Sequence, residues 1–194
     1  MLVRMRVSGG KLCVLVVLLC AGLPARNGGG AQERKFRFEQ YPAKVYRGAL
    51  ATPGWLHGAS DGTRTDGMWT DELGKPASAP AVTFAGEYLL DARSCGTECR
   101  YYKLTNLRTG KDVEQISRFD AGEDLPVTGD GHPYLTSLYY KPGSRMLIAQ
   151  YLLDFRDSHK RHSCRQQYFV LEDGQIKPLS EVQRLCTWQG EEGQ

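Results

Sequence analysis

The chain has 194 residues, a size that suits one domain behind a targeting segment, and it contains 25 basic and 22 acidic residues. Four of the basic residues and no acidic residue lie in positions 1–31, so 25 less four leaves 21 basic against 22 acidic residues in positions 32–194. A near-neutral domain without a basic stripe has no electrostatic footprint for nucleic acid, and we therefore expect no nucleic-acid partner.

The first 31 residues have the pattern of a signal peptide. Basic residues near the start precede an apolar run of 12 residues at 12–23, and small residues follow at 29–31. A helix of that length spans about 18 Å, which is short of the roughly 30 Å of membrane hydrocarbon; an uncleaved anchor is the alternative. No later apolar run approaches about 18 residues, so we expect a periplasmic or secreted domain over 32–194, with no transmembrane anchor after cleavage.

The segment at 50–80 is dense in Gly, Pro, Asp and Thr, and it follows a short strand predicted at 44–49. Such composition predicts a long loop, and long loops in compact domains are usually functional or disordered. This loop carries Trp55, His57 and Trp69. Because Trp often anchors interfaces, these three residues are candidates for partner binding. The alternative is that one or both Trp side chains fold back to form the loop's own small core.

Alternating apolar residues from Val82 onward predict strands joined by turns. Two of these strands, at 82–90 and 100–107, flank the stretch CGTEC. Further strands are predicted at 134–140, 145–155, 164–172 and 175–179. The strand at 145–155 is apolar on both faces, so we expect it to be central in a sheet. Asp173-Gly174 predicts a hairpin turn before the last strand.

The C-terminal end has a different pattern. Ser180 and Gln183 fit a capping box, and Leu179, Val182 and Cys186 would share one face of the short helix that this box predicts. Together with the strands, this predicts a mainly β fold: an antiparallel meander or sandwich-like sheet of hairpins with a short C-terminal helix.

Beyond position 31 the chain has four cysteines, Cys95, Cys99, Cys164 and Cys186. An even number in an exported chain predicts two disulfides, with three connectivities open. Fully extended, Cys95 and Cys99 would lie about 13 Å apart. A disulfide needs Cα atoms within about 7 Å, so their pairing requires a turn, which Gly96 permits. We favour Cys95–Cys99 across a hairpin tip and Cys164–Cys186, which would pin the predicted terminal helix to the penultimate strand.

A metal or redox role for these cysteines has less support. The C-x₃-C spacing supplies two ligands where structural zinc needs four, although His159 and His162 lie close to Cys164 in the sequence. A redox centre would prefer C-x-x-C beside a βαβ pattern, and the sequence has neither. We therefore interpret the four cysteines as structural, and we expect no metal and no cofactor.

Residues 84–111, FAGEYLLDARSCGTECRYYKLTNLRTGK, resemble a group of small exported bacterial proteins of unknown function. The shared pattern reads N-F-A-G-x-Y, a strand, C-G-x-x-C, a strand and T-G-K, and this chain has Thr83 in place of the Asn. The upstream Y-P-x-K-V-Y element at 41–46 and PGSRMLIA at 142–149 also match. The resemblance implies a β-rich periplasmic domain and carries over no catalytic residue.

The sequence contains no motif that specifies a reaction. PGSRM at 142–146 lacks the second Gly of a nucleophile elbow, and neither an H-E-x-x-H zinc motif nor a phosphate-binding loop occurs. Asp130-Gly-His132 places an acid beside a base, which would suit a hydrolase, but Asp-Gly before Pro133 is also ordinary turn chemistry. Asp154 is interpreted as part of a solvated charged loop.

These observations favour a non-enzymatic periplasmic or secreted protein that binds another macromolecule. The partner that we expect first is a protein in the periplasm, and a concrete version is an immunity-type inhibitor of a toxin delivered to that compartment, by analogy only. A cell-wall or glycan-binding module that uses Trp55 and Trp69 is the second hypothesis. An unrecognised hydrolase built on His132 and Asp130 is the third.

Overall fold

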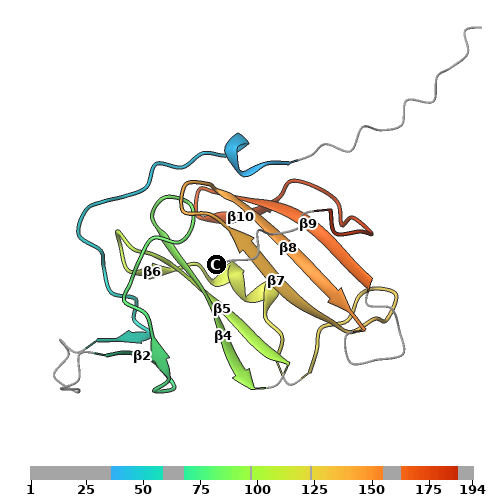
Figure 1. The fold of residues 1–194 in the computed structure, drawn as a ribbon, viewed down its shortest axis with the longest axis horizontal. Coiled ribbons are helices and arrows are strands. Elements are labelled where there is room, and N and C mark those ends of the chain that lie inside the picture. The colour runs from blue at the N-terminus through green and yellow to red at the C-terminus, as the bar shows by residue number, and fades with distance from the viewer. Residues whose placement is uncertain (1–35, 59–67, 97, 123, 155–162, 188–194) are drawn as a thin grey trace, which may run out of the picture. The chain divides into compact units, whose positions relative to one another are not determined.

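The computed structural model describes residues 36–58, 68–96, 98–122, 124–154 and 163–187 (Figure 1). The predicted signal peptide lies outside these residues. All described residues belong to one compact unit, Lys35–Gln194. In this part of the chain, no helix is both long and apolar enough to cross a membrane.

The larger sheet has four antiparallel strands in the order β10-β9-β8-β7 (Figure 1). Its strands are β7 (Tyr134–Tyr140), β8 (Met146–Leu153), β9 (Ser163–Glu172) and β10 (Gln175–Pro178). β8 lies between two neighbours, and residues 146–149 are all buried, as the apolar pattern on both faces predicted. Asp173 and Gly174 form the β9–β10 turn with φ of 52° and 71°, which confirms the predicted hairpin.

The second sheet consists of a long hairpin and one short strand, in the order β4-β5-β6. Its strands are β4 (Tyr88–Gly96), β5 (Cys99–Asn106) and β6 (Lys111–Asp112). The register pairs Leu90 with Leu104 and Ala92 with Tyr102. A 3-10 helix, η3 (Glu114–Phe119), follows β6 and buries Ile116 and Phe119.

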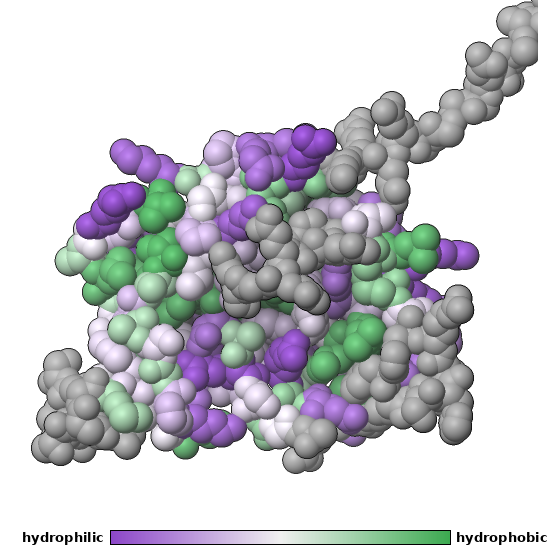
Figure 2. Space-filling model, viewed as in Figure 1, coloured by the Kyte–Doolittle hydropathy of each residue, from purple (hydrophilic) through white to green (hydrophobic). Residues whose placement is uncertain are grey.

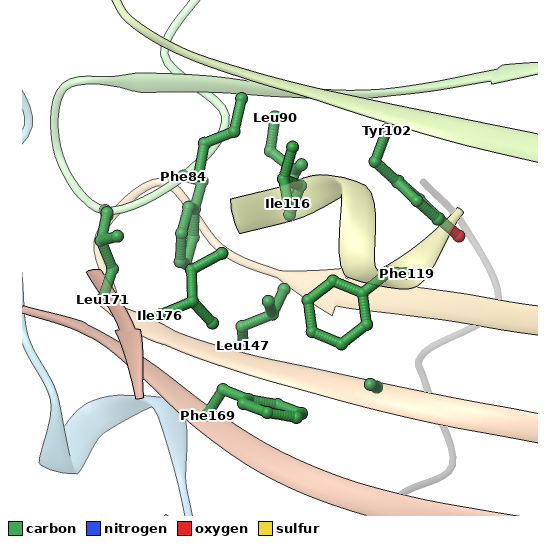
Figure 3. Packing of buried hydrophobic residues seen from close by; sticks show 12 residues of the cluster. Phe84, Leu90, Tyr102, Ile116, Phe119, Leu147, Phe169, Leu171 and Ile176 are labelled. Carbon is green, nitrogen blue, oxygen red and sulfur yellow. The ribbon is translucent and has the colours of Figure 1, made fainter. Parts of the chain in front are cut away.

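The main core lies between the hairpin sheet and the four-stranded sheet, with η3 between them (Figure 3). Apolar side chains from both sheets and from η3 fill it: Phe84, Ala85, Leu90, Tyr102, Leu104, Ile116, Phe119, Leu147, Ala149, Phe169, Leu171 and Ile176. Removal of this apolar surface from water is the main driving force that joins the two layers. The mainly β, sandwich-like prediction is confirmed.

The outer face of the four-stranded sheet has its own smaller core. Met146, Ile148 and Tyr168 pack there against Phe38, which lies in a second 3-10 helix, η1 (Phe38–Gln40). Residues 44–49, where a strand was predicted, form no strand.

Within the segment at 50–80, the structure contains three short strands: β1 (Leu56–His57), β2 (Trp69–Asp71) and β3 (Pro76–Ala77). The order is β1-β2-β3. The Asp71 side chain is buried, and its Oδ1 accepts the backbone N–H groups of Leu73 and Lys75 at 2.9 and 2.8 Å. This part of the predicted loop is therefore an ordered turn between two strands.

The predicted C-terminal helix is wrong for residues 179–187. The backbone N–H and C=O of Gln183 pair with those of Gln166 at 2.7 and 3.0 Å, along the edge of β9. The Ser180 hydroxyl accepts the N–H of Tyr168 at 3.2 Å instead of capping a helix. The segment is held extended because β9 offers unpaired backbone groups that a helix would leave unsatisfied.

Tyr140, which is partly buried against the main core, predicts a loss of stability in alkali. Burial raises the pKa of the Tyr140 phenol to about 12, with the charges of Asp91 and Tyr102 adding to the effect, while an unfolded chain has a pKa of about 10. Because the folded value is the higher one, this stabilisation is complete below pH 10 and is lost as the pH rises from about 10 to 12.

We expect Tyr140→Phe to lower the free energy of unfolding by about 1 kcal/mol at pH 7, because the hydroxyl donates to the Leu90 carbonyl at 3.0 Å. The variant should lose less further stability than the natural chain between pH 10 and 12. Urea unfolding followed by circular dichroism across that range measures both effects, and parallel pH curves for the two proteins would contradict the assignment.

Candidate functional site

The tip of the β4–β5 hairpin carries the first disulfide. Cys95 and Cys99 are bonded with a Cα–Cα distance of 5.1 Å, and Gly96 pairs with Cys99 at the end of the ladder. Two residues of the turn have positive φ, Gly96 at 151° and Glu98 at 64°. The predicted pairing and the predicted turn are confirmed.

This tip lies away from the core. Leu89 and Leu90 in the first half of β4 are buried, whereas Ala92, Ser94 and Cys95 are exposed. The tip lies at the lower edge of the view in Figure 1. A disulfide at this place covers no core; it restricts a ring of five residues, which contributes about 2 kcal/mol in the loop-entropy account and fixes the shape of the tip.

The outer half of the hairpin is held by one arginine. Arg93 Nε lies 2.6 Å from Asp91, its Nη1 lies 3.5 Å from Asp71, and its guanidinium stands 5.2 Å from the centre of the Trp55 ring. Burial raises the pKa of Asp91, and the neighbouring Arg93 opposes that rise. Arg93 therefore joins the hairpin to the small β1-β2-β3 sheet.

The candidate partner-binding tryptophans lie together in a small core rather than on an open loop. Trp55 is 5% exposed, and its Nε1–H donates to Thr105 Oγ1 at 3.0 Å. Trp69 is half-buried and packs against the same cluster as Trp55; a Cβ added at Gly58 would lie 2.7 Å from the Trp69 ring. His57 is exposed. Trp55 therefore follows the alternative prediction, in which the loop forms its own small core. Its ring is too buried to contact a ligand.

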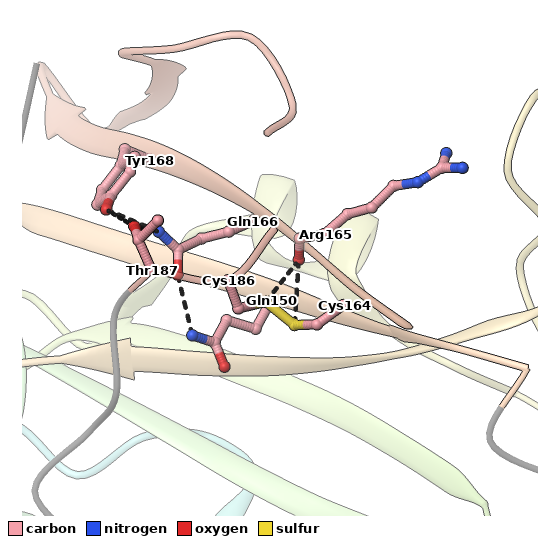
Figure 4. The surroundings of a disulfide bond; sticks show 7 residues. All are labelled: Gln150, Cys164, Arg165, Gln166, Tyr168, Cys186 and Thr187. Atoms are coloured by element: carbon pink, nitrogen blue, oxygen red, sulfur yellow. Dashed lines mark hydrogen bonds between the residues drawn. A yellow bond between two sulfur atoms is a disulfide. The ribbon is translucent and has the colours of Figure 1, made fainter. Parts of the chain in front are cut away.

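The second disulfide lies beside a buried network of polar side chains. Cys164 and Cys186 are bonded with a Cα–Cα distance of 5.5 Å, which confirms the other predicted pair. Figure 4 shows the polar network beside it, in which the fully buried Gln166 donates to Tyr168 Oη at 2.7 Å and accepts from Gln150 at 2.9 Å. This disulfide pins the C-terminal segment to the start of β9.

The acid that contacts His132 differs from the one that the sequence suggested. His132 Nδ1 lies 2.8 Å from Asp154 Oδ2, whereas Asp130 Oδ2 is 3.9 Å from Nε2. Both oxygens of Asp130 accept instead from Arg165, at 3.1 and 2.6 Å. These hydrogen bonds hold the pKa of Asp130 well below its usual range.

Asp154 was missed as the partner of His132 because it lies 22 residues away, at the end of β8. An aspartate can orient an imidazole for proton transfer, and this is the one element of acid–base chemistry in the cluster. Within the described ranges, no group of three or more His, Cys, Asp or Glu side chains could hold a metal ion.

Two shallow hollows have linings that mix charged with apolar side chains. One, of about 550 Å³, lies beside Arg145 and Glu172, which face each other at 3.5 Å. The other, of about 390 Å³, runs along β5 beside Tyr101, Lys103 and Asp112. On the face drawn in Figure 2, hydrophobic residues occur in small groups between hydrophilic ones. Neither hollow includes the stapled tip, which is a separate exposed feature.

No family model matches the chain, and neither a curated protein nor a solved structure matches it. Its function is therefore inferred from its own residues and their geometry.

The two disulfides should contribute differently to stability. Cys164→Ser with Cys186→Ser is expected to lower the free energy of unfolding by about 3 kcal/mol, because a ring of about 23 residues is opened. Cys95→Ser with Cys99→Ser should cost about 2 kcal/mol and leave the core intact. Urea unfolding measures both values. A tip variant that is the less stable of the two would contradict this order.

The placement of Trp55 and His57 gives a second stability test. Trp55→Ala should cost about 3–5 kcal/mol, as for a large core side chain, and His57→Ala should change stability by no more than about 0.5 kcal/mol. Thermal unfolding by circular dichroism compares the two variants. A Trp55→Ala protein as stable as the His57→Ala protein would show that the ring is not a core residue.

Proposed function

We propose that this chain is an exported, non-enzymatic domain that binds another protein through the stapled tip of the β4–β5 hairpin. The concrete version is an immunity-type inhibitor, whose tip enters and blocks a cleft of a toxin delivered to the periplasm. The observation that carries the proposal is the Cys95–Cys99 disulfide on an exposed tip that lies outside the core.

The physical support comes from preorganisation. Binding costs free energy when a flexible loop must be ordered on contact, and a loop that is already rigid avoids much of that cost. Leu90 and Leu104 are buried at the inner end of the hairpin, away from the disulfide, so we expect the disulfide to act mainly on the tip itself. A fixed, exposed turn is suited to insertion into a concave partner.

The two disulfides and the predicted signal peptide support the same proposal, because both favour an oxidising compartment outside the cytosol. Both disulfides fit an oxidising compartment, since thiols are kept reduced in the cytosol. The pattern of residues 1–31 gives a route to such a compartment, and the periplasm is the place where an inhibitor of a delivered toxin would act.

The other two hypotheses receive less support. Glycan stacking by Trp55 would need a ring that is now 5% exposed and hydrogen-bonded to Thr105. A hydrolase centred on Asp130 and His132 would need an acid that instead forms a two-point ion pair with Arg165. In contrast, Cys95 and Gly96 at the tip are exposed and do not belong to the core.

We predict that residues 32–194, tagged and immobilised, will retain a protein from the periplasmic extract of the bacterium that encodes the chain. Cys95→Ser with Cys99→Ser should reduce that retention at least tenfold, because the tip loses its fixed shape while the core persists. Quantitative mass spectrometry of the eluates measures the retention.

A matched control is available in the β5–β6 turn. Thr109 and Lys111 are exposed, and Ser at both positions introduces the same pair of side chains into another turn of the same sheet. This control should bind like the natural chain. Retention of cell-wall material with no protein, or equal capture by the tip variant and the natural chain, would refute the proposal.

A further inference from the structure

The two disulfides of this protein differ in how open they are to another molecule. Cys95, at the tip of the β4–β5 hairpin, is exposed, and its partner Cys99 is half-buried. Exchange between a disulfide and a thiol begins when a thiolate reaches one of the two sulfur atoms, so its rate depends on access. Exposed disulfides are for that reason the labile and regulatory ones.

The second disulfide is shielded from such an attack. Cys164 and Cys186 are both half-buried, and their sulfur atoms lie 3.7 and 3.4 Å from the carbonyl oxygen of Arg165 (Figure 4). The partial negative charge of that oxygen repels an incoming thiolate. The backbone pairing of Gln183 with Gln166 also holds the chain beside this disulfide against β9.

The charges around the tip favour attack at Cys95 rather than at Cys99. The Lys75 ammonium donates to the Ser94 carbonyl at 2.7 Å, so a positive charge stands beside Cys95. On the other side of the turn, Glu98 directly precedes Cys99 in the chain. A positive charge attracts a thiolate and a negative charge repels it. The sulfur of Cys95 is therefore the atom attacked, and Cys99 is the leaving group.

The closed tip also holds a strained backbone. Glu98 has a φ of 64°, which lies in the left-handed region that residues other than glycine rarely occupy. Such a conformation persists only where the surrounding structure imposes it. Here the tight turn and the ring closed by Cys95 and Cys99 impose it together. Opening the disulfide removes one of these two constraints, which favours reduction.

The hairpin next to the tip is held by contacts that do not involve the disulfide. The backbone of Arg100 exchanges two hydrogen bonds with Ala121, at 2.8 and 2.7 Å. The Arg100 guanidinium also donates to the Ser137 hydroxyl at 3.2 Å. Leu90 and Leu104 are buried further along the same two strands. We therefore expect reduction to change the shape of the tip and to leave the chain folded.

We propose that the Cys95–Cys99 disulfide is a reversible redox switch, which a dithiol reductant opens and a disulfide oxidant closes again. This inference rests on the proposed function, because the switch controls the binding of the partner. The closed tip is already ordered and binds, whereas the open tip must be ordered on contact and releases the partner.

The reduction exchanges one sulfur–sulfur bond for another. A thiolate of the reductant gives its electron pair to Cys95 Sγ, the bond to Cys99 breaks, and Cys99 leaves as a thiolate that takes a proton from water. The second thiol of the reductant loses its proton to water, attacks the mixed disulfide and releases Cys95. Two electrons thus pass from the dithiol, which ends as a disulfide, to the tip. Closure is the reverse exchange.

Dithiothreitol is the probe of the first test, and the second disulfide is the control within the same molecule. The folded natural chain is treated with this dithiol, samples are blocked with N-ethylmaleimide, and mass spectrometry of peptides measures the reduced fraction of each pair over time. We expect Cys95–Cys99 to be reduced at least about tenfold faster than Cys164–Cys186. Equal rates, or faster reduction of Cys164–Cys186, would overturn the inference.

A monothiol identifies the sulfur that is attacked. With glutathione in place of dithiothreitol, the mixed disulfide should form on Cys95 and leave Cys99 to react with N-ethylmaleimide. A mixed disulfide mainly on Cys99 would overturn the direction of attack that the charges of Lys75 and Glu98 predict.

The second test measures binding of the periplasmic protein that the natural chain retains, purified and titrated by isothermal calorimetry. The chain with a reduced tip, separated from the reagent, should bind at least about tenfold more weakly, with an unchanged circular dichroism spectrum in the far ultraviolet. Oxidised glutathione should restore the disulfide and the affinity. Full-strength binding by the reduced chain, or a loss that reoxidation does not restore, would overturn the inference.

The outcomes separate this inference from the proposed function. If the tip resists selective reduction while the natural chain retains a protein that the Cys95→Ser, Cys99→Ser variant does not, the proposed function survives and only the switch fails. If the natural chain retains no protein at all, both fail.

Discussion

Burial of Leu90 opposite Leu104 fixes the inner end of the β4–β5 hairpin, and the other features of the site depend on it. Because side chains alternate along a strand, this register turns Asp91 and Arg93 to the opposite face, where Arg93 meets Asp71. The same register directs the Ala92 backbone to the free edge. The register set by this apolar pair thus places Leu90 in the core and Arg93 beside Asp71.

Features with local causes could be predicted from the sequence. The Asp173-Gly174 turn was recognised because few residues adopt positive φ without cost, and the central position of β8 followed from an apolar run with no polar face. The Cys95–Cys99 pairing was also predictable, since a bond between such close cysteines requires a turn and the flanking strand patterns supply one.

Features with distant causes could not be predicted. Ser180 and Gln183 fit a helix cap in sequence, but pairing with β9 prevails over that local preference. The burial of Trp55 depends on Thr105, 50 residues away, and the hydrogen bond of His132 depends on Asp154. No signal in the sequence marks these contacts, because each one forms only after the sheets have been assembled.

Several strand edges of this protein are covered by groups of the chain itself. The Asp120 carboxylate accepts the Tyr102 N–H at the edge of β5, and the segment around Gln183 covers the edge of β9. Thr83 closes one end of the β4 edge. Edges that are covered in this way are protected from pairing with other chains. Beyond them, the Cys95–Cys99 disulfide keeps the exposed tip of the β4–β5 hairpin in one shape.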